Sequence, residues 1–387
     1  MTSNFYETVV VGAGIEGLAT AYCLAKYGKK VLVLEQFPLP HTRGSSSGQM
    51  RVTRVAYRKS EYVRMMLEAH ERWHQLEKES KLLLYRKTGI VVLGAPDHPK
   101  LLAYQSAMKQ CGAPCAMLTH QELKDAYGHL LTPQPNDVAM FEPDGGLLYV
   151  GHCTNAYLSG CRKAGAEILD GTEVDSIVPG HPATVVLRDR RQIKAQSVVV
   201  TMGAWAPKFF KQKLNLHLPI WSERTLTTFW KENVLDLYAA DNGTPCFLFG
   251  EKLMYHIKPT LEYKGLLQFG NHYGHPVDPD DPEQVTAALR KAYIQRCDQT
   301  GRLYGLKIDT TAPAVIENCF YTESIDADFI LDRHPKHDNI IIGTGFSGHG
   351  YKIAPTVGDI LARFACKMPQ KYNVQIFAIS RFNNSKL

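Results

Sequence analysis

The chain has 387 residues, of which 44% are hydrophobic and 21% are charged, a length and composition typical of a soluble globular protein with two domains and no membrane span. Its net charge of +6 comes from lysines and arginines scattered along the chain, which argues against nucleic-acid binding and favours a small anionic ligand. The nine cysteines form no CxxC pair. We therefore expect most of them to be reduced and buried, and we expect no metal site.

The N-terminal segment predicts a strand, a tight turn and a helix. Residues 6–11 (YETVVV) run directly into GAGIEG at 12–17, and a helical pattern and a second strand ending at Glu35 follow. The apolar stretch is interrupted by Glu16 and three glycines, and no basic region precedes it. These features exclude a secretory signal.

This arrangement is the fingerprint of a dinucleotide-binding site. Gly12 permits the tight turn, Gly14 lets a pyrophosphate approach the helix N-terminus, and Gly17 lets the helix pack on the strand. Glu35 lies about 20 residues further on, where an acidic residue holds the adenosine ribose. We expect Ile15, Gln36 and Val174 to lie beside the same cofactor. The fingerprint by itself does not choose between FAD and NAD.

Residues 41–57 (HTRGSSSGQMRVTRVAY) predict a small polar loop that leads to a helix beginning near Glu61. The hydroxyl groups of Ser45 and Ser46 suit a phosphate and flavin cradle, and three arginines could bind anions. These arginines are Arg43, Arg51 and Arg54. A solvated basic loop explains the same composition equally well.

The middle of the chain predicts an α/β arrangement with an interruption. Residues 62–76 have the apolar spacing of an amphipathic helix, and 84–94 read as strands. The Pro- and Gly-rich stretch 133–149 predicts a loop or hairpin crossing between domains. A helix is expected at 152–164 and buried strands at 195–207 and near 339–350. The pattern implies a dinucleotide domain assembled from separated pieces of chain, with a second domain inserted between them.

The C-terminal part carries two further signals. Residues 343–352 (GTGFSGHGYK) contain four glycines together with His349 and Lys352. The last three residues, 385–387, are SKL, the tripeptide that the peroxisomal import receptor recognises at a free C-terminus. The sequence therefore predicts a peroxisomal protein.

Five segments, read together, identify a family. VVVGAGIEG, HTRGSSSGQMRVTRVAY, ENCFYT, DFILDRHP and GFSGHGYK, in this order, strongly resemble the monomeric sarcosine oxidase family, nearest to its peroxisomal sarcosine and L-pipecolate oxidase branch. The resemblance spans essentially the whole chain. It implies a Rossmann-type FAD-binding domain (1–80, 150–215 and 320–387) interleaved with an antiparallel-sheet α+β substrate domain (81–149 and 216–319).

The resemblance also implies an activity and its residues. A secondary amino acid such as sarcosine or L-pipecolate would be oxidised by hydride transfer to FAD, with O2 as acceptor, by a monomeric enzyme. Cys319 would hold the flavin covalently, and the backbone at Gly345, Gly348 and Gly350 would face its ring. Arg54 and Lys352 would bind the substrate carboxylate. The residues expected to line the same face are Arg51, His272 and His349.

Two positions depart from the family pattern. Gln268 stands where typical members have a lysine that activates oxygen, and His256 stands where a tyrosine is expected to face the substrate. A neutral amide stabilises developing superoxide far less than a cation does. Three hypotheses therefore stay open: an FAD-dependent amine oxidase, a flavin amino-acid dehydrogenase that reacts poorly with O2, and a flavin-loaded binding protein with little turnover.

Overall fold

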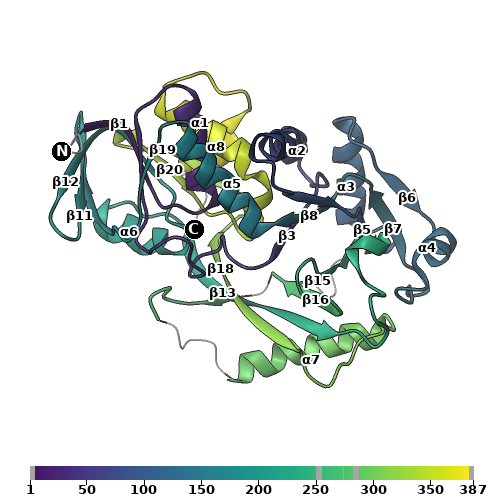
Figure 1. Ribbon diagram of the computed structural model, residues 1–387. Helices are drawn as coiled ribbons and strands as arrows, with labels where there is room; N and C mark the ends of the chain where they lie inside the picture. The colour runs from purple at the N-terminus through teal and green to yellow at the C-terminus, as the bar shows by residue number, and fades with distance from the viewer. Residues whose placement is uncertain (1–4, 250–254, 273, 282–286, 383–387) are drawn as a thin grey trace.

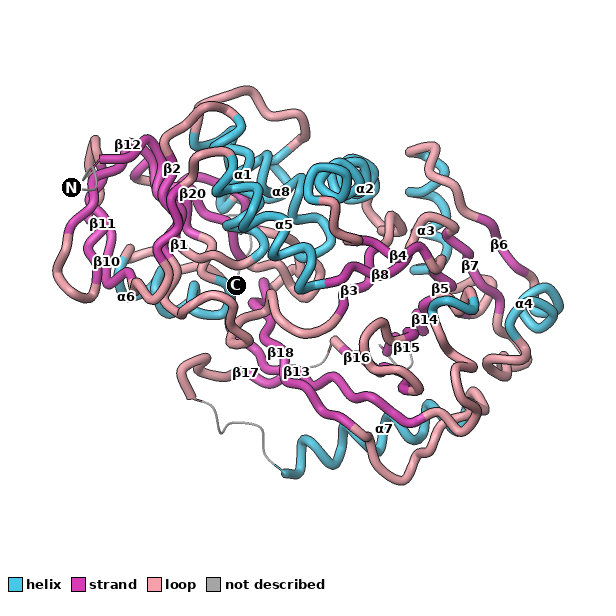
Figure 2. The backbone as a smooth tube through the Cα atoms, in the orientation of Figure 1, coloured by secondary structure: helices cyan, strands magenta, loops and turns pink. Residues whose placement is uncertain are grey.

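The computed structural model describes residues 5–249, 255–272, 274–281 and 287–382 (Figure 1). The predicted C-terminal tripeptide lies outside these residues. In the part that is described, three sheets form the framework, and a layer of helices covers one face of the first sheet (Figure 2). None of the described helices has the length and apolar character needed to cross a membrane.

The first sheet is built on five parallel strands in the order β9-β2-β1-β12-β20. Two antiparallel strands extend it beside the first half of β12, and β19 pairs with β20. Its strands are β1 (Phe5–Val11), β2 (Val31–Leu34), β9 (Glu167–Leu169), β10 (Val174–Val178), β11 (Ala183–Leu187), β12 (Gln192–Val200), β19 (Ile330–His334) and β20 (His337–Thr344).

Helices pack on both faces of this sheet because the central strand β1 is apolar on both faces. Val10 points into the core formed with helices α1, α2, α5 and α8, whereas Val9 and Val11 point to the opposite side, where α6 packs. Two-sided burial is typical of a parallel sheet. The helices are α1 (Ile15–Lys26), α2 (Ser60–Ser80), α5 (Val150–Lys163), α6 (Ala206–Lys213) and α8 (Ala354–Ala365).

The second sheet has the order β17-β13-β16-β15-β14-β5-β7-β6, and β18 pairs with β13. Helix α7 packs under it through Tyr293 and Cys297. Its strands are β5 (Ile90–Gly94), β6 (Ala116–Leu118), β7 (Val138–Glu142), β13 (Ile220–Lys231), β14 (Cys246–Phe249), β15 (Tyr255–Pro259), β16 (Leu266–Asn271), β17 (His275–Pro276) and β18 (Val315–Ser324). The helices near it are α3 (Pro99–Gln110), α4 (His120–Tyr127) and α7 (Ala287–Leu303).

A small third sheet, β3-β8-β4, lies between the two large ones in the view of Figure 1. Its strands are β3 (Met50–Thr53), β4 (Tyr85–Lys87) and β8 (Gly146–Tyr149). Short 3-10 helices complete the described elements: η1 (Gly203–Trp205), η2 (Ala240–Asn242), η3 (Tyr351–Ile353), η4 (Val374–Phe377) and η5 (Ile379–Phe382).

The predicted α/β fold class is confirmed, with three local corrections. The segment 133–149 is not a hairpin, because β7 pairs within the second sheet and β8 within the third. The loop 41–57 contains β3, because its Met50–Thr53 segment pairs with β8. The strand predicted at 195–207 ends at Val200, where the chain turns into η1 and α6.

The domain boundaries stay a prediction. The boundary placed between residues 319 and 320 falls inside β18, which continues to Ser324 along β13. All nine cysteines are free thiols, and five of them are buried, as the absence of CxxC pairs predicted.

Helix α8 lies against α1 at a glycine that leaves no room for a side chain. A Cβ at Gly358 would lie 2.6 Å from the carbonyl carbon of Ala19. Overpacking of this kind costs about 1–3 kcal/mol. We therefore predict that Gly358→Ala lowers the free energy of unfolding by about 1–3 kcal/mol, measured by urea denaturation.

Gly151, near the start of α5, is the matched control, because a Cβ there would meet no atom within 4 Å. Gly151→Ala should leave stability unchanged or raise it by about 0.5–1 kcal/mol, since alanine is the better helix former. Equal stability of the two variants would contradict the close packing of α1 on α8.

Candidate functional site

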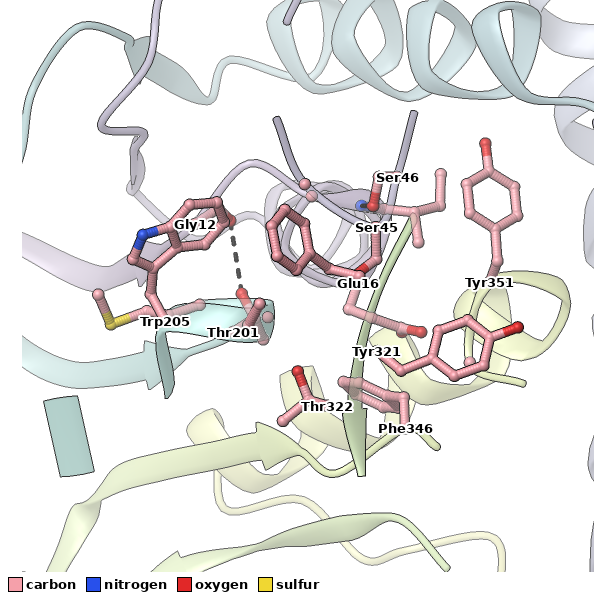
Figure 3. Close-up of a pocket in the computed structure, with 18 of the residues that line it drawn as sticks. Gly12, Glu16, Ser45, Ser46, Thr201, Trp205, Tyr321, Thr322, Phe346 and Tyr351 are labelled. Atoms are coloured by element: carbon pink, nitrogen blue, oxygen red, sulfur yellow. Dashed lines mark hydrogen bonds between the residues drawn. The ribbon is translucent and has the colours of Figure 1, made fainter. Parts of the chain in front are cut away.

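A cavity of about 880 Å3 is lined by elements of both large sheets. One end is formed by the turn after β1, the start of α1 and the end of β2, and the other by β15, β16, β18 and residues 346–352. Figure 3 shows part of its wall, with Glu16 and Ser46 on one side and Tyr321 and Phe346 on the other. The cavity is therefore large enough for a cofactor and a small ligand together.

The glycine-rich turn has the geometry that its sequence predicts. Gly12 adopts φ +101°, and a Cβ there would lie 2.4 Å from the carbonyl oxygen of Thr201. A Cβ at Gly17 would lie 1.9 Å from the carbonyl oxygen of Gly12. Gly14 caps α1 without a side-chain hydrogen bond, and the N–H of Ile15 donates to Ser46 Oγ at 2.9 Å. The positive end of the helix dipole is thus exposed to the cavity.

Glu35, at the end of β2, supplies a carboxylate to the same end of the cavity. Burial disfavours its ionisation, but His41 and the N–H groups of Phe37 and Ala13 outweigh burial and hold its pKa below the ordinary value. The N–H of Ala13 donates to Oε2 at 2.9 Å and that of Phe37 to Oε1 at 3.0 Å. The carboxylate is therefore ionised and fixed in position.

Glu16 is a buried carboxyl group without a hydrogen-bond partner. The residue is 7% exposed, and neither carboxyl oxygen has a partner among the described residues. Burial raises the pKa of this carboxyl group well above its ordinary value. An unsatisfied buried group that lines a cavity indicates a polar ligand.

The other end of the cavity is lined by alternate residues of two paired strands. Lys258 on β15 lies opposite Gln268 on β16, and His256 lies opposite Gly270. Partners that face each other across a ladder project to the same side, as do residues two apart. With His272, these residues form one polar face toward the cavity.

Four cations converge on this region: Arg51, Arg54, Lys258 and Lys352. In the part of the chain that the structure describes, none of them forms an ion pair with a carboxylate. Burial, followed by the charges of Arg54, Lys258 and Arg51, lowers the pKa of Lys352 well below its ordinary value. Burial, followed by Arg51, lowers the pKa of Lys258 to about 8. The site is therefore electrostatically poised for an anion.

Three histidines around these cations are held neutral. Burial, followed by Lys258, lowers the pKa of His256 well below 6.5, and burial followed by Lys352 does the same to His349. The side chain of His272 is exposed. Desolvation by the surrounding protein, followed by the charge of Lys352, lowers the pKa of His272 to about 4. His272 Nδ1 lies 3.4 Å from the hydroxyl of Tyr321.

Arg54 is held in place by a carboxyl group that is distant in sequence. Glu142, at the end of β7, accepts the N–H of Val55 at 2.5 Å and that of Ala56 at 3.0 Å. The guanidinium of Arg54 donates to the carbonyl of Ala56 and lies 4.6 Å from the ring centroid of Tyr57. These contacts fix the direction of Arg54 toward the cavity.

Cys319 lies on β18 beside Arg51. The guanidinium Nη2 of Arg51 is 3.6 Å from the Cys319 sulfur. The same group donates to the carbonyl oxygens of Ser45 at 2.9 Å and Ser47 at 2.6 Å. The arginine is thus anchored by the backbone and places positive charge next to the thiol.

Most of the residues predicted from sequence line this cavity. They are Gly12, Gly14, Ile15, Glu35, Gln36, Ser45, Ser46, Arg51, Arg54, Val174, His256, Gln268, His272, Cys319, Gly348, His349, Gly350 and Lys352. Three others do not. Gly17 serves the packing of α1, Gly345 adopts φ +66° against Ser324, and the exposed Arg43 stacks over Phe37. The functional roles assigned to these residues stay predictions.

Sequence reasoning did not single out Lys258, Glu142 or Glu16 as site residues. Only the alternation of His256 and Lys258 along an expected strand could have placed Lys258 on the cavity side. Glu142 lies 86 residues from Ala56, whose N–H it accepts, so no local pattern marks it. Glu16 stands inside the glycine fingerprint, where any residue is accepted.

Comparison with known proteins identifies the class. The pattern of the family described as FAD dependent oxidoreductase matches residues 7–364. The chain therefore belongs to this family and is an FAD-dependent oxidoreductase, and FAD is its cofactor.

Individual relatives cover the whole chain. It is 39% identical to the peroxisomal sarcosine oxidase of Homo sapiens over 98% of this chain and 97% of the relative. It is 31% identical to the monomeric sarcosine oxidase of Bacillus sp. (strain B-0618), again over 98% and 97%. L-proline dehydrogenase from P. horikoshii shares the fold, with a TM-score of 0.82 at 22% identity over 99% of both chains. The resemblance expected from the sequence is confirmed.

The residues present fit FAD. The glycine turn and the start of α1 suit a pyrophosphate, and the fixed carboxylate of Glu35 suits a ribose. The buried carboxyl group of Glu16 has no hydrogen-bond partner among the described residues, and a bound polar ligand would supply one. The residues at this end and those of the cationic region line one and the same cavity.

We predict that Glu142→Gln lowers the free energy of unfolding by about 1–3 kcal/mol, because the amide nitrogen cannot accept either N–H. Burial raises the pKa of Glu142 to about 7, although the two N–H donors oppose it. A raised pKa contributes stability that is complete below the unfolded value and is lost as the pH rises through 7. The free energy of unfolding that Glu142→Gln loses relative to wild type should therefore be larger at pH 5 than at pH 8.

Urea denaturation at both pH values measures this difference. The exposed Glu71 on α2 gives the matched control, and Glu71→Gln should change stability by less than about 0.5 kcal/mol at either pH. A deficit for Glu142→Gln that does not depend on pH would show that Glu142 is ionised throughout this range.

Proposed function

We propose that the protein is a peroxisomal oxidase of secondary or N-alkyl amino acids such as sarcosine, L-pipecolate or a related compound. One observation carries the proposal: the buried Lys352 and the half-buried Arg54 are cations without a carboxylate partner among the described residues, and they line the same cavity as the FAD fingerprint. An amino-acid carboxylate would supply the missing charge. The names of the relatives support the same substrate class.

The proposed reaction breaks one C–H bond and the N–H bond of the amine and forms a C=N bond. When bound, FAD would supply the acceptor for the hydride and the route by which both electrons reach O2. O2 takes up two electrons and two protons and becomes H2O2, and the imine is then hydrolysed in water.

The protein's own residues bind and orient the substrate. Arg54 and Lys352 hold the carboxylate at two points, which fixes the C–H bond relative to the ring of the cofactor. His256 and His272 are neutral at physiological pH, so they can accept hydrogen bonds and stabilise the amine in its neutral, reactive form. Gly14 and Glu35 would hold the pyrophosphate and the ribose of FAD.

We infer further that Cys319 holds the flavin through a thioether bond. The support is its place on the cavity wall, 3.6 Å from the guanidinium of Arg51. A cysteine sulfur on the cavity wall supplies the kind of nucleophile that such a bond needs. The covalent bond would prevent loss of the cofactor.

The location, the partners and the monomeric state are proposals as well. SKL at the C-terminus, residues 385–387, matches the signal read by the peroxisomal import receptor, and the human and mouse relatives are named as peroxisomal. A monomer is in keeping with the name of the bacterial relatives. A peroxisomal compartment suits an enzyme that releases H2O2.

A flavin dehydrogenase with poor O2 reactivity is the second candidate. Gln268 is 4% exposed, and its Oε1 has no partner in the described part of the chain. This neutral amide occupies the position at which a cation would aid electron transfer to O2. The two candidates differ only in the acceptor, because both require reduction of the flavin by an amino acid.

Anaerobic mixing of the purified yellow protein with sarcosine, L-pipecolate, L-proline and saccharopine tests the function. We predict loss of the flavin absorption band with sarcosine or L-pipecolate, and return of colour when air is admitted. Persistent bleaching in air would favour the dehydrogenase. A flavin that no member of the panel reduces would contradict the proposed substrate class.

Lys352→Met tests the carboxylate clamp in the same experiment. Removing one charged partner costs about 1.5–3 kcal/mol, so the amino-acid concentration giving half-maximal bleaching rate should rise about tenfold or more. For the methyl ester of the substrate, which lacks the carboxylate charge, this half-maximal concentration should rise much less in the variant. The exposed Lys109 on α3 provides the control Lys109→Met, for which we expect wild-type behaviour. An equal loss for acid and ester would refute the clamp.

Cys319→Ser tests the covalent bond. We predict that wild-type protein keeps its yellow colour after precipitation in trichloroacetic acid, because the thioether survives denaturation, and that the variant releases FAD into the supernatant. Cys366→Ser, a second half-buried cysteine, should retain the colour. Release of flavin from wild-type protein would disprove the linkage.

A further inference from the structure

Lys258 is a buried lysine whose charge has no evident structural purpose. It is 4% exposed, and its side chain lines the cavity. Within the described residues, its ammonium group makes neither a hydrogen bond nor an ion pair. Burying an ammonium group costs several kcal/mol unless it is paired. A lysine in this situation indicates a function rather than a contribution to stability.

The surroundings of Lys258 do not neutralise it. The charged and titratable groups that influence it are Arg51, Cys246, Cys319 and Glu317, and in turn it influences His256, His272 and Lys352. Of these, Glu317 is the one carboxylate among the described neighbours, and it accepts a hydrogen bond from Tyr263 at 3.2 Å. In the described part of the chain, Glu317 forms no ion pair with Lys258, and Arg51 acts with burial to lower the pKa of Lys258 to about 8.

The register places Lys258 directly beside Gln268. The two residues are partners across the β15–β16 ladder, and their side chains project to the same face. Adjacent strands are separated by about 4.8 Å, so the long stem of a lysine can bring its ammonium over the position of the neighbouring side chain. Lys258 can therefore put a charge where Gln268 has none.

The other three cations already have tasks. Arg51 is anchored by the carbonyl oxygens of Ser45, Ser47 and Met50. Arg54 and Lys352 serve the substrate carboxylate in the function proposed above. Of the four cations at this end of the cavity, Lys258 is the one left without a role.

We propose that Lys258 stabilises the anion that forms when O2 receives its first electron, so that electron transfer from the reduced cofactor to O2 depends on this residue. The proposal rests on the oxidase function proposed above and deepens it. O2 takes up one electron and becomes superoxide, whose negative charge lies beside the ammonium group. A second electron and two protons complete H2O2, and the electrons come from the C–H bond of the amino acid. A preorganised charge in a buried site costs no reorganisation at the moment of reaction.

The test separates this step from substrate oxidation. The flavin of the purified holoenzyme is reduced anaerobically with dithionite, so that no amino acid is needed, and is then mixed with oxygenated buffer in a stopped-flow spectrometer. We expect Lys258→Met to slow the second-order reoxidation about 100-fold or more, the loss typical when one stabilising group is removed. Lys264→Met, at the exposed turn of the same hairpin, should reoxidise within about twofold of wild type.

Two further variants keep the test decisive. Lys258→Arg retains the charge and should reoxidise much faster than Lys258→Met. The double variant Lys258→Met/Gln268→Lys moves the ammonium to the neighbouring strand and should recover most of the lost rate. If the methionine variant fails to fold or to retain FAD, a wild-type rate in the double variant and a slow rate in Lys258→Met/Gln268→Met would decide the question.

A spectroscopic measurement on the resting enzyme gives an independent readout. Deprotonation of a lysine near the ring should shift the flavin absorption spectrum as the pH rises through about 8, the pKa that burial followed by Arg51 gives Lys258. The shift should disappear in Lys258→Met and persist in Lys264→Met. Loss of the spectral transition in Lys258→Met would show that the charge of Lys258 lies near the flavin ring. This result does not require any amino acid to reduce the protein.

Two results would overturn the inference. Wild-type reoxidation in Lys258→Met would remove Lys258 from the oxygen reaction. Wild-type reoxidation combined with weaker binding of amino dicarboxylates would make it a substrate-binding residue instead. If dithionite-reduced protein reoxidises slowly only in Lys258→Met while no amino acid bleaches the wild type, the inference holds and the proposed substrate class fails.

Discussion

The arrangement of positive charge in one cavity is the constraint on which the rest of the structure depends. Arg51, Arg54, Lys258 and Lys352 converge there, and in the described part of the chain none of them forms an ion pair with a carboxylate. Burial and mutual repulsion lower the pKa of both lysines. A folded protein tolerates such a cluster only if the fold holds it together and a ligand completes it.

The fold holds the cluster by joining segments that are far apart in sequence. The short third sheet orients the chain around Arg51, and Glu142 at the end of β7 fixes the backbone beside Arg54. The β15–β16 hairpin presents Lys258, and the turn after β20 presents Lys352. At the opposite end of the cavity, the glycine turn and Glu35 are suited to FAD. One cavity therefore has a nucleotide end of strict geometry and a cationic end.

Sequence alone predicts the nucleotide end well and the cationic end only in part. Gly12, Gly17 and Glu35 follow from steric and charge requirements that act within one strand-turn-helix unit, so a local pattern reveals them. The proposed role of Lys258 depends on its pairing with Gln268 on the next strand. A local sequence pattern does not predict this strand register. Glu142 acts across 86 residues. The crossing at 133–149 was predicted, but its two strands, which pair in different sheets, were not, because their partners are distant in sequence.

The most direct test of the central claim is whether an anion completes the site. Acetate, which carries a carboxylate but cannot be oxidised as an amine, is titrated into the holoenzyme by calorimetry at pH 8 in two buffers of different ionisation enthalpy. A bound anion raises the lowered pKa values of Lys258 and Lys352, so the account predicts net proton uptake on binding, reduced in Lys352→Met. Binding without proton uptake, or with proton release, would contradict it.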